Sequence, residues 1–564
     1  METQHLKYMT TNKFTKETIV LVLVIIVAAF VRIVSLSSVP PHLTPDEASL
    51  GYNAYSILKT GRDEHGALFP IIFKSFGDNK PGLYVYITLP FVALFGLNEF
   101  STRIASALFG VLAVFVLYKI GKYLFSQENK ALPLVSAVLL ALSPWHIMLS
   151  RGAWEVNVAL TLTLIGIYFF LRGLTTPKYL YISSCFFALT LLAYQGAKLS
   201  SAIVVILLLI SFYKKIKKVP LKTWIISVVT GIIISFPIII SLFTGQASRL
   251  SVFSVFSAPR PAEFLTNFLN EGNEQKGTIQ YYAFHSEGFN FLRGIMGRWF
   301  NHFSGRFLFF EGDWQNPRHS APYVGMLNIL DLPLLLFGIY GLIKAKNREV
   351  SVFIFLWLIL ACLPAILSRD QVHAVRSFNM VIPLLLVSTY GVSKLIEIVS
   401  HKKVFWMGGI ILYLVGFLYF LDAYFVHLPK LNSQYWEYGF KQAVEDVLPI
   451  QKNYKTIIFQ QSYSQPYIYF LFYGKYDPAK FQGYIANHFI ESKFGDVGQV
   501  DSLDNIQFKG IDWQILRGAK GTLVVGDSER IPEGDSKEGT EFHVISDIRY
   551  LNNKATALRI IEIK

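Results

Sequence analysis

The chain has little charge and almost no cysteine. Only 16% of its 564 residues are charged, against roughly 25% in soluble domains, whereas 52% are hydrophobic. The two cysteines, Cys185 and Cys362, both lie inside apolar runs, which excludes a disulfide framework and a cysteine metal site. Apolar runs near the ~20 residues that a bilayer-spanning helix needs recur along the first three quarters of the chain. The sequence therefore predicts a polytopic α-helical membrane protein.

The net charge of +14 is not concentrated in one basic patch, so the sequence favours no nucleic-acid partner. The basic residues stand in short clusters between apolar runs, and cytoplasmic loops of membrane proteins are enriched in lysine and arginine. The first run, from about Thr18 to Leu36, is long enough for a retained span, and Pro40-Pro41 does not resemble a signal-peptide cleavage site. We predict eleven spans, near residues 18–38, 101–124, 131–148, 156–173, 179–195, 199–213, 222–243, 323–343, 350–367, 378–397 and 404–424.

This arrangement makes the chain a multi-pass protein of the cell membrane, with a cytoplasmic N-terminus and an extracytoplasmic C-terminus. The apolar run Leu83–Leu97 is predicted to be juxtamembrane, because it is short and contains Pro90 and Gly96. The membrane part would cover residues 1–424, with long outer loops at 39–100 and 244–322. Residues 425–564 read as an extracytoplasmic α/β domain. YKTIIFQ and GTLVVGD are predicted strands, and a hairpin turns at Asn552-Asn553.

The first outer loop contains the motif TPDE at positions 44–47. Thr44, the following proline and Glu47 match a helix start with a capping box, which alone would explain the motif. Asp46 is the freer carboxylate, because neighbouring helical positions point about 100° apart. It is a candidate general base for glycosyl transfer. The nearby DEHG, residues 63–66, reads as a solvated turn.

Lys80 lies in FGDNKPGLYVY, a turn rich in glycine and proline that opens the juxtamembrane helix. It is either a lysine snorkelling beside the membrane or a cation that binds an anionic lipid head group. Arg151 and Glu155 are spaced i and i+4 at the expected start of a span, where a local ion pair is the simpler interpretation.

The second outer loop ends in several polar groups: His302, Arg306, Asp313, Arg318 and His319. Their spacing follows no recognised metal-ligand pattern, so we predict no metal site. A phosphate site built by Arg318 fits guanidinium geometry better. His373 and Arg376, in a later outer loop, are either a second phosphate contact or charged residues that have no role beyond the membrane topology.

The chain resembles the bacterial branch of the protein mannosyltransferase and aminoarabinose transferase group, which has the GT-C membrane glycosyltransferase fold. The resemblance is carried by TPDEASLGYNAYSILKTGRDEHG, GDNKPGLYVY, LFGLNEFSTRIASALFGVLAVFVLYKIGKYLF, SPWHIMLSRGAWE and GDWQNPRH. It implies a polyprenyl-phosphate sugar donor, membrane lipids as partners, an acceptor hydroxyl on lipid, glycan or protein, and inversion at the anomeric carbon. No nucleotide or organic cofactor is implied, and a divalent cation stays open.

Within this resemblance, Asp46 matches the catalytic base, Glu155 a second acidic position, and Lys80 the contact to the donor phosphate. Pro81-Gly82 stands where relatives have two prolines. Arg318 and His319 match the basic pair that closes the large loop. The expected site therefore has Asp46 and Glu155 as catalytic residues, and a substrate-binding set of Glu47, Lys80, Arg151, Arg318, His319, His373 and Arg376.

Two other classes of protein compete with this interpretation. A transporter or flippase of lipid-linked glycans would place ionisable or helix-breaking residues near the midplane of its spans, often in repeated halves. In this sequence the charges concentrate in the outer loops, and no repeat is visible. A binding module on a membrane anchor would need one span only.

Overall fold

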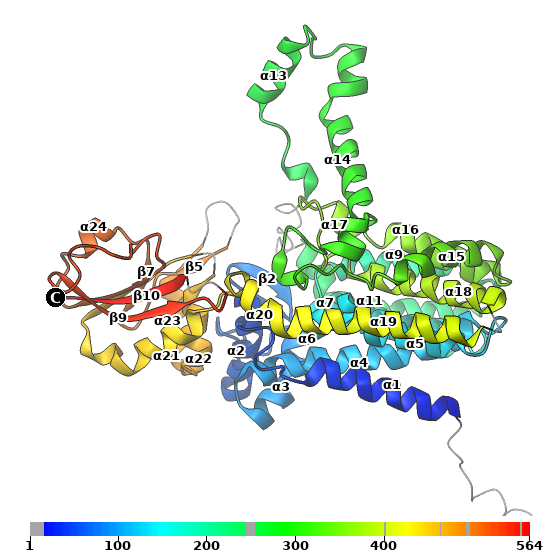
Figure 1. The fold of residues 1–564 in the computed structure, drawn as a ribbon, viewed down its shortest axis with the longest axis horizontal. Helices are drawn as coiled ribbons and strands as arrows, with labels where there is room; N and C mark the ends of the chain where they lie inside the picture. The colour runs from blue at the N-terminus through cyan, green and yellow to red at the C-terminus, as the bar shows by residue number, and fades with distance from the viewer. Residues whose placement is uncertain (1–15, 244–253, 400–401, 463, 492–496, 553–554) are drawn as a thin grey trace, which may run out of the picture.

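A computed structural model describes residues 16–243, 254–399, 402–462, 464–491, 497–552 and 555–564. It consists of a bundle of helices that run side by side, with a sheet-containing tail at one end (Figure 1). The bundle is formed by α1 (Lys16–Ile33), α4 (Glu99–Leu124), α5 (Leu132–Leu142), α6 (Pro144–Arg151), α7 (Glu155–Gly173), α8 (Tyr179–Ala193), α9 (Ala197–Ser211), α11 (Leu221–Phe243), α15 (Asp331–Lys344), α16 (Arg348–Leu360), α17 (Leu363–Ile366), α18 (Val381–Val399) and α19 (Lys403–Asp422).

Among the described residues, six helical segments are long and apolar enough to cross a membrane, or seven if the bent pair α5 and α6 is one span. The six are Glu99–Leu124, Glu155–Gly173, Leu221–Ser241, Arg348–Ile366, Phe378–Val399 and Lys403–Leu431. The predicted multi-helix membrane fold is therefore present, but the predicted number of eleven spans is not confirmed. The other predicted spans coincide with helices that are shorter or more charged. For example, α1 contains Lys16, Glu17 and Arg32, and α15 begins only at Asp331.

The first long loop, residues 39–100, folds into α2 (Pro45–Thr60), a two-stranded hairpin of β1 (Ile72–Ser75) and β2 (Asp78–Pro81), and α3 (Leu83–Phe95). α2 ends at Gly61, which adopts the left-handed conformation that a helix C-cap needs. α3 has 13 residues, a length of about 20 Å, which is short of the ~30 Å hydrocarbon core. Its length is that expected of the juxtamembrane segment.

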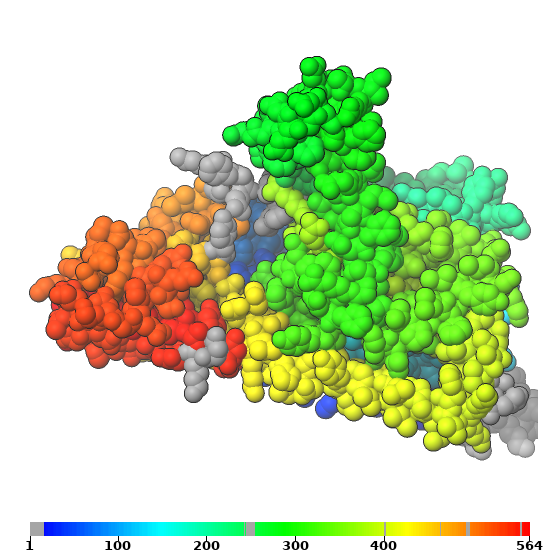
Figure 2. All heavy atoms as spheres, turned by 45° about the horizontal axis from the view of Figure 1, so that its top comes forward, coloured from blue at the N-terminus to red at the C-terminus, as the bar shows by residue number. Residues whose placement is uncertain are grey.

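The second outer loop contributes η2 (Val255–Ser257), α13 (Ala262–Glu271), η3 (Tyr281–His285), α14 (Glu287–His302), η4 (Arg306–Phe310) and η5 (Pro317–His319). α13, η3 and α14 form an arm that projects from the bundle near its tail end (Figures 1 and 2). The segment after α14 returns to the bundle and packs its buried phenylalanines into the main core.

The tail begins with η7 (Ala423–His427), α20 (Leu428–Leu431) and η8 (Ser433–Trp436). Its sheet has the strand order β6-β7-β3-β8-β10-β9. β3 is parallel to β7 and β8, and the other pairs are antiparallel. The six strands are β3 (Thr456–Gln460), β6 (Ser502–Leu503), β7 (Ile506–Lys509), β8 (Thr522–Gly526), β9 (Phe542–Arg549) and β10 (Thr556–Ile563).

A second small pair, β4 (Phe489–Ile490) and β5 (Gln499–Val500), lies outside this sheet, and the tail helices are α21 (Phe440–Ile450), α22 (Pro466–Tyr473), α23 (Pro478–His488) and α24 (Trp513–Leu516). The two predicted strands correspond to β3 and β8, and the predicted hairpin to β9 and β10. Asn553 of the predicted turn lies outside the described residues.

The tail packs directly on the first outer loop. Apolar residues of α2, α3, α21 and α22 belong to one buried cluster. Polar contacts cross the same boundary: the Tyr469 hydroxyl donates to the Leu43 carbonyl at 3.1 Å, and the Tyr52 hydroxyl donates to the Tyr476 carbonyl at 3.1 Å. The Lys441 ammonium bonds to Glu99 at the start of α4 at 2.7 Å. The loop that carries the predicted site is thus clamped between the bundle and the tail.

Candidate active site

The N-terminus of α2 is fixed by the predicted capping box. The Thr44 hydroxyl accepts from the Glu47 amide at 3.2 Å, and the Glu47 carboxylate accepts from the Thr44 amide at 3.0 Å. Glu47 also accepts from the Arg103 guanidinium at 2.9 Å and from the Ala153 amide at 2.8 Å. Its side chain is 2% exposed and that of Arg103 is 0% exposed. Both oxygens of Glu47 are therefore engaged by protein groups, which locks the start of α2 to α4 and α7.

Lys80 reaches the same place from the β1–β2 hairpin. The two-residue turn between these strands has Phe76 and Gly77 at φ of 53° and 80°, the left-handed pair typical of a type I′ hairpin. This register sets Lys80 opposite Phe73. The Lys80 ammonium lies over the Phe76 ring at 5.4 Å and forms an ion pair with the Asp46 carboxylate.

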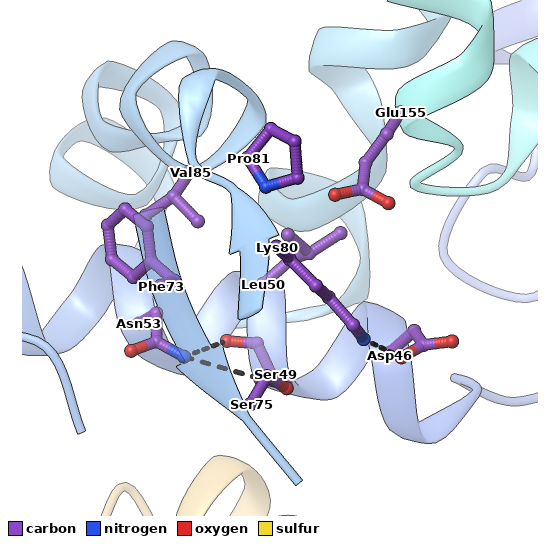
Figure 3. A pocket seen from close by; sticks show the side chains of 10 residues that line it. All are labelled: Asp46, Ser49, Leu50, Asn53, Phe73, Ser75, Lys80, Pro81, Val85 and Glu155. Atoms are coloured by element: carbon purple, nitrogen blue, oxygen red, sulfur yellow. Dashed lines mark hydrogen bonds and ion pairs between the residues drawn. The ribbon is translucent and has the colours of Figure 1, made fainter. Parts of the chain in front are cut away.

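Asp46, Lys80 and Glu155 line one pocket together with the apolar side chains of Leu50 and Phe73 (Figure 3). The Lys80 side chain is 14% exposed, whereas that of Asp46 is 66% exposed. Burial disfavours the charged form of Lys80, but the nearby carboxylates of Asp46 and Glu155 outweigh it and raise the pKa of the lysine. The pocket therefore holds a charged ammonium near two carboxyl groups that come from different helices.

Ser49, Asn53 and Ser75 also line this pocket and give it a polar wall that the sequence did not predict. The Ser49 hydroxyl is 2.9 Å from the Ser75 hydroxyl. Ser49 and Asn53 donate to the Glu64 carboxylate at 3.3 Å and 3.1 Å. Burial raises the pKa of Glu64 to about 8, although the bonds from Asn53 and Ser49 oppose that shift.

The interpretation of DEHG as a solvated turn is wrong, because Asp63 and Glu64 are 1% and 0% exposed. The tail helix α23 covers the turn, and the Gln482 side chain donates to the Asp63 carbonyl at 3.0 Å. No local sequence signal marks this burial, since the cover comes from more than 400 positions away.

Arg151 and Glu155 do not form the local ion pair that their spacing allows. Arg151 is the last residue of α6, Glu155 is the first of α7, and Gly152 follows α6 in extended conformation. The guanidinium of Arg151 is fully buried and donates to the carbonyls of Val31, Val34 and Val39. The helix is broken between the two residues, and only Glu155 lines the pocket.

A second polar cluster contains Asp313, His319 and His373. Asp313 is fully buried, and its carboxylate lies 3.1 Å from His319 Nδ1 and accepts from the Ala374 amide at 2.8 Å. The rings of His319 and His373 lie 5.1 Å apart. Burial is the main cause that lowers the pKa of both histidines.

One ligand atom from each of these three residues lies within 4.8 Å of the others, close enough to hold a metal ion. Arg318 and Arg376, however, add positive charge that also lowers the pKa of both histidines. Arg376 is itself paired with Asp370, and Asp313 contributes a carboxylate to the cluster, so these charges do not by themselves select an anion over a cation. The absence of a metal site stays a prediction. The fold does bring Arg318, His319, His373 and Arg376 together in one cluster.

The second cluster adjoins the pocket. The ring of Trp154, the residue before Glu155, packs edge-on against His319 with centroids 5.4 Å apart. Tyr194, between α8 and α9, lies within electrostatic reach of both Arg376 and Glu155. Of the expected residues, Asp46, Lys80 and Glu155 thus form one group and the basic residues a neighbouring one. Glu47 and Arg151 lie in the supporting framework.

The fold is shared with a membrane glycosyltransferase of known structure. The crystal structures of ArnT from Cupriavidus metallidurans match the chain with TM-scores of 0.52 for the form bound to undecaprenyl phosphate and 0.53 for the apo state. The sequence identities are 13% and 12%, and the matches cover 96% and 97% of this chain and 97% and 98% of ArnT. The chain therefore has the GT-C type of fold.

A family model and a curated relative each match part of the chain. Residues 79–240 match the family model of dolichyl-phosphate-mannose-protein mannosyltransferase. A curated relative from Bacillus subtilis (strain 168), "Putative mannosyltransferase YycA", is 25% identical over 283 residues, which cover 49% of this chain. The match spans 37% of that relative's length. These findings confirm the resemblance to GT-C-like membrane glycosyltransferases that the sequence motifs indicated.

Proposed function

We propose that the chain is an inverting glycosyltransferase that moves a sugar from a polyprenyl-phosphate donor to an acceptor hydroxyl at the extracytoplasmic face of the membrane. One observation carries the proposal: Asp46, Lys80 and Glu155 come from separate elements and line a single pocket. The undecaprenyl phosphate bound in the ArnT crystal structure supports a lipid phosphate as the donor's carrier. The family match supports a sugar such as mannose.

Lys80 is placed to bind the donor phosphate. Its ammonium is charged, nearly buried and paired with the Asp46 carboxylate. A phosphate that entered the pocket would compete for this ammonium. Charge-assisted bonds of this kind contribute roughly 1.5–3 kcal/mol each. Arg318 and Arg376 in the adjoining cluster would meet the remaining phosphate oxygens.

Asp46 is the proposed base. Once Lys80 binds phosphate, the exposed carboxylate of Asp46 faces the acceptor hydroxyl. The hydroxyl oxygen attacks the anomeric carbon, its proton passes to Asp46, and the bond between that carbon and the phosphate oxygen breaks. The leaving lipid phosphate keeps the electron pair, stabilised by the cations around it. Glu155 is proposed to orient the acceptor or the sugar from the opposite wall.

The first test measures binding and slow hydrolysis of a panel of polyprenyl-phosphate sugars by the purified protein in lipid nanodiscs. Lys80→Ala is expected to weaken binding of the accepted donor by about tenfold or more, which corresponds to the loss of about 1.4 kcal/mol or more. Asp46→Asn is expected to bind the donor and to stop turnover. The sugar that binds identifies the donor.

Lys74→Ala is the matched control, because Lys74 lies on the same hairpin but pairs with Glu491 outside the pocket. If it weakens donor binding as much as Lys80→Ala, the effect is one of hairpin folding. If no donor binds and Asp46→Asn behaves as wild type, the transferase proposal is wrong. The competing transporter function would then be measured as glycolipid flux across vesicles.

A further inference from the structure

The arm formed by residues 262–302 leaves many apolar side chains exposed. It contains α13, η3 and α14, and its own buried cluster consists of Leu265, Leu269 and Tyr281 alone among the described residues. Outside this cluster, Phe264 and Phe268 stack on each other while both stay exposed. An arm of this composition in water would expose far more apolar surface than its small core hides.

The apolar residues of α14 are arranged as a stripe. Phe289, Leu292, Met296 and Phe300 are 38%, 58%, 50% and 60% exposed. They follow one another at intervals of three and four positions, so they lie on one side of the helix. Arg293 lies about 60° round the helix from Met296, at the edge of the stripe. An apolar stripe with a basic residue at its edge is the pattern of helices that lie in a membrane interface.

The contacts at the C-terminal end of α14 fix its position along the length of the spans. The Trp299 indole donates to the Ile359 carbonyl at 3.1 Å, next to the end of α16 at Leu360. Ile295 and Trp299 pack against the core of the bundle. α14 therefore leaves the bundle at the tail end of a membrane span and crosses the run of the helices (Figure 1).

The stripe adjoins the side of α14 that packs on the bundle. Successive helical residues are 100° apart, so the stripe residues lie about 60–140° round the helix from Ile295, which faces the bundle. On α16, Val352 and Phe355 are also exposed. Exposed apolar side chains are thus present both on this span and on the arm that leaves the bundle beside it.

We propose that the arm lies in the membrane interface on the side of the tail domain, with the stripe of α14 buried among lipid. The partner is the lipid surface, because the stripe begins where a span ends and continues its apolar surface. This inference does not depend on the proposed transfer reaction. An interfacial helix of this type sinks about 5–10 Å into the boundary between head groups and acyl chains.

The test compares labels at two adjacent positions of α14. Met296→Cys lies in the stripe, and Gly297→Cys is its matched control, because it lies about 100° round the helix from Met296, beyond Arg293, and an added Cβ there meets no atom within 4 Å. Both variants are made in a chain with Cys185→Ala and Cys362→Ala. A fluorescent thiol label is attached, and the protein is placed in nanodiscs that contain lipids brominated near the head group.

We expect the label at Met296→Cys to be quenched about two to three times as strongly as the label at Gly297→Cys, since only the first enters the bilayer. Equal and weak quenching at both positions would overturn the proposal, and the stripe would then bind protein or a second copy of the chain. To separate misfolding from this result, Phe300→Cys is measured as a second stripe position, and each variant must elute as wild type.

Discussion

The pair between Glu47 and Arg103 yields the sharpest test of how the site is held. Replacing Glu47 by leucine would leave the guanidinium of Arg103 buried without its carboxylate. Breaking a buried pair from one side costs about 3–5 kcal/mol. The Ala153 amide would lose its acceptor too, which adds about 1–3 kcal/mol if it stays buried and unpaired.

The double variant Glu47→Leu/Arg103→Leu removes both charges. Because a buried ion pair often exchanges for apolar residues at little net cost, we expect the double variant to be more stable than the single Glu47→Leu variant. The assay is thermal unfolding of the protein in nanodiscs at neutral pH, followed by donor binding on the folded fraction. Asp46 would shift with the start of α2, so turnover falls in the single variant.

The opposite pattern would refute this reasoning. If Glu47→Leu unfolds at the wild-type temperature but loses donor binding, then Glu47 contacts substrate, as the sequence analysis expected. The conservative Glu47→Gln separates the two roles further. It keeps the shape of the side chain and removes the charge that Arg103 requires, so we expect it to be destabilised with Arg103 present.

Three further outcomes follow from the contacts around the pocket. Arg318→Ala is expected to weaken donor binding, measured by titration with the donor, by about tenfold or more, the effect of losing about 1.5–3 kcal/mol. Arg306 lies on the same loop but pairs with Glu311 at the surface, so we expect Arg306→Ala to leave the donor affinity unchanged. Gly77→Ala places a side chain at φ of 80°, which costs roughly 1–2 kcal/mol; it should lower the melting temperature and weaken donor binding through Lys80. Glu64 holds its proton in the folded state up to about pH 8, against 4.5 for the ordinary group. The folded state therefore binds more protons between these values, stability falls as pH rises from 4.5 to 8 and levels off above, and Glu64→Gln should flatten that slope in thermal unfolding.

Local signals predicted the parts of the site that depend on neighbouring residues. TPDE indicated the helix start and its capping box, and both are present. The helical repeat also predicted that Asp46 and Glu47 point in different directions; Asp46 lines the pocket, whereas Glu47 closes the cap. The partner of Glu47 could not be predicted, since Arg103 lies 56 positions further along the chain, and nothing near TPDE marks it.

Other expectations failed where tertiary packing decides the outcome. The DEHG turn looked solvated because its residues are polar, but the tail covers it. Arg151 and Glu155 looked like one helix face, but the chain bends between α6 and α7 at Gly152. The number of eleven spans, which rests on apolar runs alone, is not confirmed, because several of these runs form helices that are shorter or more charged than the six long apolar helical segments among the described residues.

The packing of the tail on α2 limits which sequence changes the tail can accept during evolution. Asp46, the proposed base, lies on one side of α2, and α22 packs on another. Gly51 of α2 is so close to Phe472 of α22 that an added Cβ would lie 2.6 Å from its ring. A new tail sequence would therefore have to preserve this close fit. We therefore expect tail and loop to vary together, and we expect a chimera that exchanges one without the other to displace Asp46 from its position beside Lys80.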